Sequence, residues 1–318
     1  MERDESPMVK GRRRAPGLIL RGICMGTADV IPGVSGGTIA LIMGIYDELV
    51  QTIAAIDQRV VGALLRGRIA EVIERLNATF LLPLLLGIGL AVLSLAKLIT
   101  WLLTMHPQPV WGFFTGLILA SAFFVMRQVE GWSGVHWGLA ILGTAGGYFV
   151  TLLVPVETGT EGYKFVLAGM VAICAMILPG ISGSFLLLVM GKYQQIFTAI
   201  HERDLTIIAL AGLGALVGLL GFSRLLKRLL ARFYAETMAF LVGLMLGSLR
   251  KIWPFRNTLE EKIIGDKVRV LRDECVWPQE FSGEVWLSFA LMIAGVVLVL
   301  ILEKLGRQSA IPEAQHRG

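Results

Sequence analysis

Charged residues are scarce in this chain of 318 residues, of which only 17% are Asp, Glu, Lys or Arg. A typical soluble domain carries about 25% charged and about 45–50% apolar residues. Here 55% of the residues are hydrophobic and the mean hydropathy is +0.71. A water-soluble fold of this length needs a charged shell around its core. The composition therefore excludes a soluble enzyme, a disordered protein and a nucleic-acid reader, and it predicts a multi-spanning membrane protein.

Cysteine and histidine are also too few and too scattered to form a recognisable site. Cys24, Cys174 and Cys275 form no CxxC pair, and the four histidines show no HExxH spacing. A P-loop and a dinucleotide fingerprint are both absent. We therefore expect no metal, no cofactor and no hydrolytic or redox chemistry. The formal charge of +5 is typical of a membrane protein whose cytoplasmic loops retain Lys and Arg, so it gives no reason to expect a nucleic-acid partner.

Six apolar segments approach the length of about 20 residues that a membrane-spanning helix needs. They are residues 80–104, 110–126, 134–154, 205–225, 237–252 and 285–302. Two further apolar regions are interrupted, residues 18–45 by PGVSGG (Pro32–Gly37) and residues 165–190 by PGISGS (Pro179–Ser184). Each half of these regions has only about 10–15 residues, which is too short to cross a bilayer. Both regions are predicted to form broken, re-entrant helices.

The two interrupted regions are copies of one another. At an offset of 147, Pro32–Tyr46 matches Pro179–Tyr193 at 8 of 15 positions. A second pair, FFTGLILAS (Phe113–Ser121) and FLVGLMLGS (Phe240–Ser248), matches at an offset of 127. The sequence therefore predicts two repeats, each a broken element followed by three membrane-spanning helices. The glycines shared by the second pair, Gly116 and Gly243, are predicted to allow close helix packing.

The distribution of Lys and Arg predicts the orientation, because cytoplasmic loops retain these residues. It predicts that both termini are cytoplasmic and that residues 253–284 form an extracytoplasmic loop. Three spans are an odd number, so the second repeat enters from the opposite face, which gives an all-α fold with inverted-topology repeats. Parallel repeats would make the acidic loop 156–162 cytoplasmic, against the charge pattern. The predicted parts are a basic segment 1–16, repeats 17–155 and 160–305, and a cytoplasmic tail 306–318.

Residues 57–77 have apolar positions at helical spacing with arginines opposite them. This pattern predicts an amphipathic helix. Such a helix fits in the cytoplasmic membrane interface beside anionic lipid. The same pattern equally fits a connecting helix packed against the membrane-spanning bundle.

The two interrupting motifs are the candidate binding site. Proline and glycine stop each helix, and the helix that restarts has free N–H groups and a positive dipole end. Two such ends at membrane depth, with hydroxyl groups beside them, suit a phosphate or another anion. The alternative is that Pro and Gly merely kink two packed helices, while the serines bond back to the chain. The candidate headgroup-binding residues are Pro32, Gly33, Ser35, Gly36, Gly37, Thr38, Pro179, Gly180, Ser182, Gly183 and Ser184.

Three charged residues within apolar segments are candidates for coupling or charge pairing. Asp29 lies three residues before Pro32, and an ionisable side chain inside a membrane suggests a function by default. It could carry a coupling proton, cap backbone amides or pair with a cation. Arg21 and Lys97 could contact substrate, or they could extend to the lipid headgroups.

The strings Met25–Val50 and Met176–Ile196 resemble those of a bacterial and archaeal membrane family of polyprenyl-phosphate translocases, formerly of unknown function. The resemblance extends from about residue 17 to residue 305. It implies a transporter that returns undecaprenyl phosphate to the cytoplasmic face for cell-envelope synthesis. From the repeats and Asp29 we expect alternating access, with a coupling proton or cation. The resemblance implies the lipid, whereas the motifs alone predict only a transporter of anions.

Other classes of function remain open from the residues alone. A transporter of a small soluble anion could use the same helix ends. A lipid-phosphate hydrolase would need a His, Arg and Asp constellation that the sequence lacks, and a structural scaffold would not need broken helices at membrane depth. The sequence says nothing of the oligomeric state.

Overall fold

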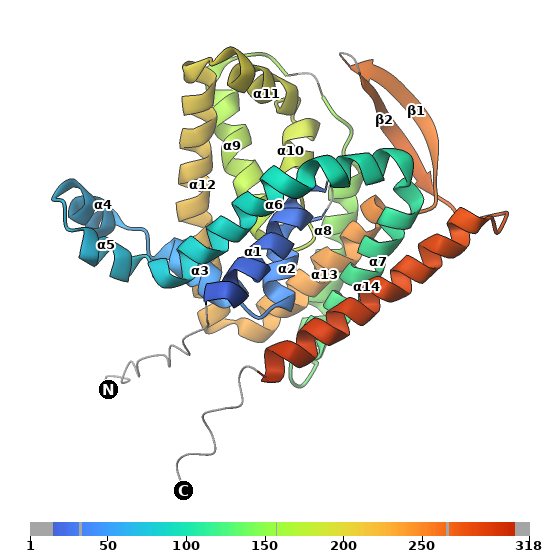
Figure 1. Cartoon of the computed structure of the whole chain (residues 1–318), viewed down its shortest axis with the longest axis horizontal. Coiled ribbons are helices and arrows are strands. Elements are labelled where there is room, and N and C mark those ends of the chain that lie inside the picture. The colour runs from blue at the N-terminus through green and yellow to red at the C-terminus, as the bar shows by residue number, and fades with distance from the viewer. Residues whose placement is uncertain (1–14, 32–33, 157, 265–266, 309–318) are drawn as a thin grey trace, which may run out of the picture.

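The computed structural model describes residues 15–31, 34–156, 158–264 and 267–308 (Figure 1). This part of the chain is mostly helical. Its helices are α1 (Ala15–Val30), α2 (Gly36–Ile42), α3 (Tyr46–Ala54), α4 (Gln58–Leu65), α5 (Ile69–Arg75), α6 (Ala78–Met105), α7 (Pro107–Met126), α8 (Gly134–Leu152), α9 (Gly162–Ile177), α10 (Gly183–Val189), α11 (Tyr193–Glu202), α12 (Leu205–Arg232), α13 (Tyr234–Ile252) and α14 (Gly283–Gln308). Of the predicted terminal segments 1–16 and 306–318, most residues lie outside the described ranges.

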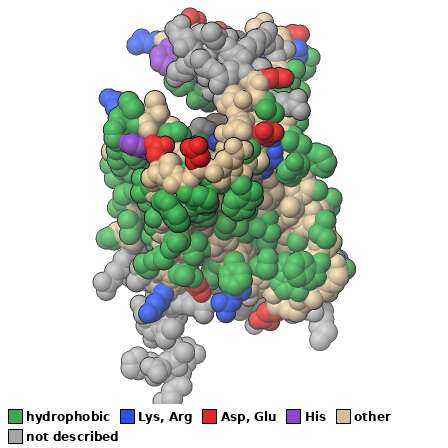
Figure 2. Space-filling model, turned by 90° about the vertical axis from the view of Figure 1, so that its right-hand side faces the viewer, with side chains coloured by type: hydrophobic (Ala, Val, Ile, Leu, Met, Phe, Trp, Pro, Cys, Tyr) green, Lys and Arg blue, Asp and Glu red, His purple; other side chains and the backbone are tan. Residues whose placement is uncertain are grey.

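Within the described residues, five helices are long and apolar enough to cross a membrane, namely α6, α7, α8, α12 and α14. Their outward side chains are apolar, such as Leu93, which is 84% exposed, and Leu205, which is 75% exposed. Figure 2 shows hydrophobic side chains covering the middle of one face, with charged side chains gathered above and below them. Exposed apolar surface in a band of this kind suits contact with lipid. The chain is a multi-pass membrane protein.

The predicted span 237–252 lies in α13, which is not among these five helices. Its two ends are charged, so any 18-residue stretch of the helix contains Glu236, Arg250 and Lys251. Its middle is apolar and largely buried, because α13 packs against both α8 and α7. The helix is therefore shielded by protein rather than by lipid.

Helices pack in four pairs through glycine. The pairs are α1 with α6, α7 with α14, α8 with α13, and α9 with α12. Facing Gly143 and Gly147 on α8 are Gly243 and Gly247 on α13, so a Cβ on Gly243 would collide with the carbonyl oxygen of Ala140. Small residues four positions apart let two helices approach closely. Such close packing stabilises the pair in lipid, where the hydrophobic effect does not drive helices together. The close packing predicted for Gly116 and Gly243 is confirmed, since Gly116 lies against Met292 of α14.

The all-α prediction is wrong for residues 256–275. They form an antiparallel pair, β1 (Arg256–Ile264) and β2 (Lys267–Cys275), which projects beyond the helices in Figure 1. Each strand contains β-branched residues, and Gly265–Asp266 stand between the two strands in the sequence, which is a signal for a hairpin. The sequence predicted only a loop here, because the many charged residues of this segment hide the apolar periodicity that marks a strand.

The stretch 57–77 forms two short helices, α4 and α5, and not the single helix predicted. Gly67 between them has φ +69°, a left-handed conformation that ends a helix. Glu71 pairs with Arg68 at 3.6 Å and with Arg75 at 3.0 Å. Both helices lie to one side of the other elements in Figure 1, and Ile69 and Ile73 are exposed.

Candidate functional site

Each motif connects a long helix to a short one. The first lies between α1 and α2, and the second lies between α9 and α10. α2 and α10 have 7 residues each. Gly180 has φ +88° and lies against the backbone of Met245, so both its conformation and its surroundings require glycine. The candidates Pro32 and Gly33 lie outside the described residues.

The start of α2 is capped by two side chains. The Ser35 hydroxyl oxygen accepts a hydrogen bond from the Gly37 N–H at 3.1 Å, as serine at this position favours. The Asp29 carboxylate reaches back from the last turn of α1 and accepts from the Gly36 N–H at 2.7 Å. A Cβ at Gly36 would press on that carboxylate, so glycine makes the contact possible. Asp29 therefore places a negative charge at the first free amides of α2.

The first motif and the end of α9 are joined by buried hydrogen bonds. The Thr38 hydroxyl oxygen accepts from the Gly180 N–H at 3.0 Å. The Ser35 hydroxyl lies 3.1 Å from the Met176 carbonyl oxygen and 3.2 Å from that of Leu178, and it can donate to either. Tyr46 donates its hydroxyl proton to the Ile177 carbonyl at 3.2 Å. Segments more than 130 residues apart thus meet at the centre of the molecule, and both motifs contribute to the contact.

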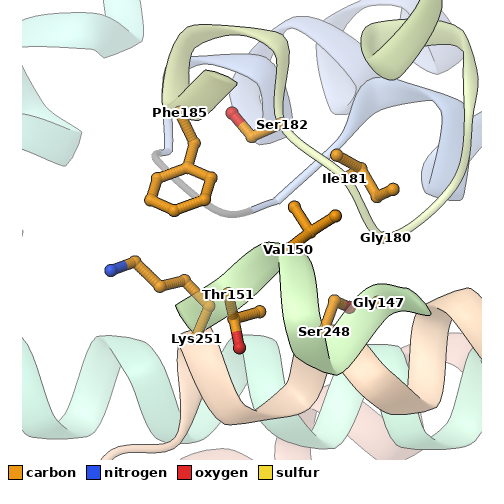
Figure 3. A pocket seen from close by; sticks show the side chains of 9 residues that line it. All are labelled: Gly147, Val150, Thr151, Gly180, Ile181, Ser182, Phe185, Ser248 and Lys251. Carbon is orange, nitrogen blue, oxygen red and sulfur yellow. The ribbon is translucent and has the colours of Figure 1, made fainter. Parts of the chain in front are cut away.

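The second motif borders a small cavity between α10, α8 and α13 (Figure 3). Ser182 is 6% exposed and its hydroxyl lies 2.9 Å from that of Ser184. The cavity measures about 10 Å³, which is room for about one water molecule. Its wall opposite Ser182 includes Thr151 and Lys251. In this conformation the space between the polar groups is therefore too small for a phosphate group.

Comparison with known proteins decides the family. A family model described as "VCA0040-like: Undecaprenyl phosphate translocase-like" matches residues 25–267, which include both motifs. The chain belongs to the undecaprenyl phosphate translocase-like family. A polyprenyl-phosphate transporter of Vibrio cholerae is 43% identical over 295 residues, covering 90% of this chain and 95% of the relative. One of Staphylococcus aureus is 35% identical over 254 residues, covering 74% and 85%. No solved structure matches this chain.

The relatives are transporters and not enzymes, as predicted for this translocase-like chain. In the described part of the chain, no three His, Cys, Asp or Glu residues gather in a way that could hold a metal ion.

The other two charged candidates lie apart from the cavity. Arg21 is half-buried on α1, about two turns before Asp29. Lys97 is exposed and lines a shallow groove of about 430 Å³ formed by α6 alone, together with Thr100 and Trp101. Neither residue lines the cavity beside Ser182.

Sequence reasoning missed Lys251 in the cavity wall. It occupies the C-terminal end of an apolar segment, where a cation is usually a marker of the membrane surface. Its side chain is turned inward, with the ammonium group 4.8 Å from the centre of the Phe185 ring. Only the tertiary packing of α13 against α8 distinguishes this lysine from a surface cation.

We expect Thr38→Val to destabilise the protein by about 1–3 kcal/mol, because the buried Gly180 N–H would lose its acceptor. Valine has nearly the same shape, so the loss measures the hydrogen bond. Thermal unfolding in detergent, followed through the fluorescence of the seven tryptophans, would measure it. Thr100→Val is the matched control, since the Thr100 hydroxyl bonds within its own exposed helix. Equal melting temperatures for the two variants would contradict a role for this contact.

Proposed function

We propose that this chain moves polyprenyl phosphate across the membrane by alternating access, with the phosphate headgroup held where the two motifs meet. The substrate class comes from the relatives, which are named polyprenyl-phosphate transporters. The observation that carries the site is the Gly180 to Thr38 hydrogen bond, because it joins the two repeat-related motifs directly. The headgroup donors would be the hydroxyls of Ser35, Thr38, Ser182 and Ser184 with the neighbouring amides.

The pairing of helices supports two inverted repeats, 17–155 and 160–305. By the sequence offsets, α1, α6, α7 and α8 correspond to α9, α12, α13 and α14. α1 packs on α6 as α9 packs on α12, and α7 packs on α14 as α13 packs on α8. Each of these four large contacts therefore has its counterpart, as a twofold relation requires. With the termini cytoplasmic, rocking of one half against the other would expose the motifs to each side in turn.

The small volume of the cavity, about 10 Å³, implies that the headgroup enters only when the motifs separate. The candidate hydroxyls are engaged with protein partners, and the space beside Ser182 holds about one water molecule. α2 and α10 are under two turns long, so hydroxyls and amides contribute more than a helix dipole can. The lipid tail would remain in the bilayer beside the apolar outer surface.

Asp29 supports coupling to a proton or a cation. A phosphate at the start of α2 would lie beside the carboxylate that already accepts from the Gly36 N–H. Two anions this close repel one another, so the headgroup enters readily only when Asp29 is protonated or paired with a cation. Substrate and proton would then share one site.

The test is reconstitution in liposomes, following how labelled undecaprenyl phosphate moves between leaflets. Wild-type protein is expected to move the lipid faster than empty vesicles do. The double variant Ser35→Ala and Ser182→Ala should slow transport about tenfold or more, because two headgroup donors are lost. Wild-type vesicles that match empty ones would refute the transport proposal. A double variant with unchanged transport would refute only the placement of the headgroup.

A further inference from the structure

We infer that Lys251 is the charged ligand of the phosphate headgroup, acting together with Ser182 in the cavity between α8, α10 and α13. This inference rests on the proposed function, and it assigns a cation to the substrate's negative charge. Both residues line the same cavity although they come from segments about 70 residues apart in the chain. Figure 3 shows Lys251 and Ser182 on opposite sides of it.

The hydrogen-bonding capacity of the lining singles out these two side chains. The Thr151 hydroxyl donates its proton to the Tyr148 carbonyl at 2.7 Å, and the Ser248 hydroxyl donates to the Met245 carbonyl at 2.8 Å. Neither has a proton left for a ligand. Among the residues that the structure describes, Lys251 Nζ has neither a hydrogen bond nor an ion pair, and its near neighbour is the Phe185 ring. Its three N–H donors are therefore free to bind an anion.

Charge around the cavity is positive and incompletely balanced. Arg250 and Arg256 share one carboxylate, that of Asp273, at 3.5 and 3.1 Å. Arg256 also donates to the Lys251 backbone carbonyl at 2.9 Å, which ties the cluster together. Counting Lys251, the described side chains of this cluster are three cations and one anion. Charge that is partly removed from water and not fully balanced is costly, and ionisable groups within a membrane mark functional sites.

A buried lysine elsewhere, Lys192, shows what a fully satisfied one looks like in this fold, whereas Lys251 is half-buried. Lys192 is 1% exposed and donates to the Gly159 carbonyl and, at 2.8 Å, to the Gln195 side-chain oxygen. It also lies 4.4 Å from the centre of the Phe165 ring. Lys192 has two oxygen acceptors and an aromatic face, whereas among the described residues Lys251 Nζ has an aromatic face and no hydrogen-bond acceptor. Lys192 is thus held structurally, and Lys251 is left with its donors available.

The Phe185 ring is a weak substitute for an anion. A cation over an aromatic face gains less than a charged group gains from a hydrogen bond to an anion. A phosphate oxygen would therefore displace the ring from Lys251. Phe185 belongs to α10, which packs on α9 and α11, so movement of this short helix would open the cavity.

The experiment measures binding of radiolabelled undecaprenyl phosphate to the purified protein in detergent. Lys251→Gln and Lys251→Met are expected to raise Kd about 10- to 100-fold, while Lys251→Arg recovers much of the affinity. Lys227→Met, which removes an exposed lysine of α12, is the matched control and should bind like wild type. Uncharged undecaprenol should bind all variants equally, because it lacks the group that Lys251 holds. Melting temperatures would identify a variant that does not fold. The deciding comparison is then between the Kd of Lys251→Arg, which keeps the positive charge, and the Kd of a folded uncharged variant, Lys251→Gln or Lys251→Met.

Three outcomes separate the explanations. Unchanged Kd in Lys251→Gln, with wild-type transport intact, overturns this inference and leaves the proposed function standing. Absence of both binding and transport in wild type overturns the proposed function itself. If inorganic phosphate alone binds in a Lys251-dependent way and undecaprenyl phosphate does not, the ligand is the free anion and the lipid assignment is overturned.

Discussion

We expect Gly214→Ala to lower the free energy of unfolding by about 3 kcal/mol, the upper end of the usual cost of overpacking. A Cβ at this position would collide with the backbone carbonyl of Val166, where α12 crosses α9. A backbone group cannot turn aside as a side chain can, so the two helices must separate. Thermal unfolding in detergent would measure the loss.

The control lies two residues away on the same helix. A Cβ at Gly212 would meet nothing within 4 Å. Gly212→Ala removes a helix-destabilising residue without any clash, so its melting temperature should equal or exceed that of wild type. If both alanine variants melted alike, close approach at Gly214 would not be what holds α9 and α12 together.

The second large effect is expected from Asp29→Asn. This variant should fold normally but lose the coupling of lipid transport to the proton gradient. Asparagine keeps a side-chain oxygen that can accept from the Gly36 N–H, but it can neither ionise nor carry a proton. One coupled proton and a gradient of one pH unit can sustain about a tenfold concentration ratio, since 1.36 kcal/mol corresponds to one unit. In wild-type vesicles the concentrations of undecaprenyl phosphate in the two leaflets should approach this ratio. In Asp29→Asn vesicles the two concentrations should remain nearly equal.

Asp204→Asn is the matched control, because Asp204 also accepts from backbone amides at the start of a helix, those of Thr206 and Ile207. That variant should respond to the gradient as wild type does. An Asp29→Asn protein that still built up the ratio would assign Asp29 to capping alone and would leave the coupling group elsewhere.

The broken elements were predictable because their signal is local. Proline, glycine and serine within six residues interrupt an apolar run, and the second copy of the motif repeats the interruption. The contact of Thr38 with Gly180 was not predictable in detail, because residues 142 positions apart leave no periodic trace. The repeats supported only the hypothesis that the two motifs lie together at a substrate site.

Lys251 shows a different limit of sequence reasoning. A cation at the end of an apolar segment is the expected surface marker, and that rule explains most loops of this chain. Whether such a residue turns inward depends on what its helix packs against. The sequence shows two glycines four residues apart in each of α8 and α13. It does not show that these two pairs of glycines face one another.

The charged ends of α13 carry a consequence for how the protein is made. Its apolar middle is framed by Glu236, Arg250 and Lys251, and its surface is complementary to α7 and α8 more than to lipid. Ribosomal synthesis delivers α7 and α8 to the bilayer before α13 emerges, and chains assemble in that order. We therefore expect α13 to insert against α7 and α8, which reach the bilayer before it. Biogenesis of this protein would then depend on the order in which its helices are made.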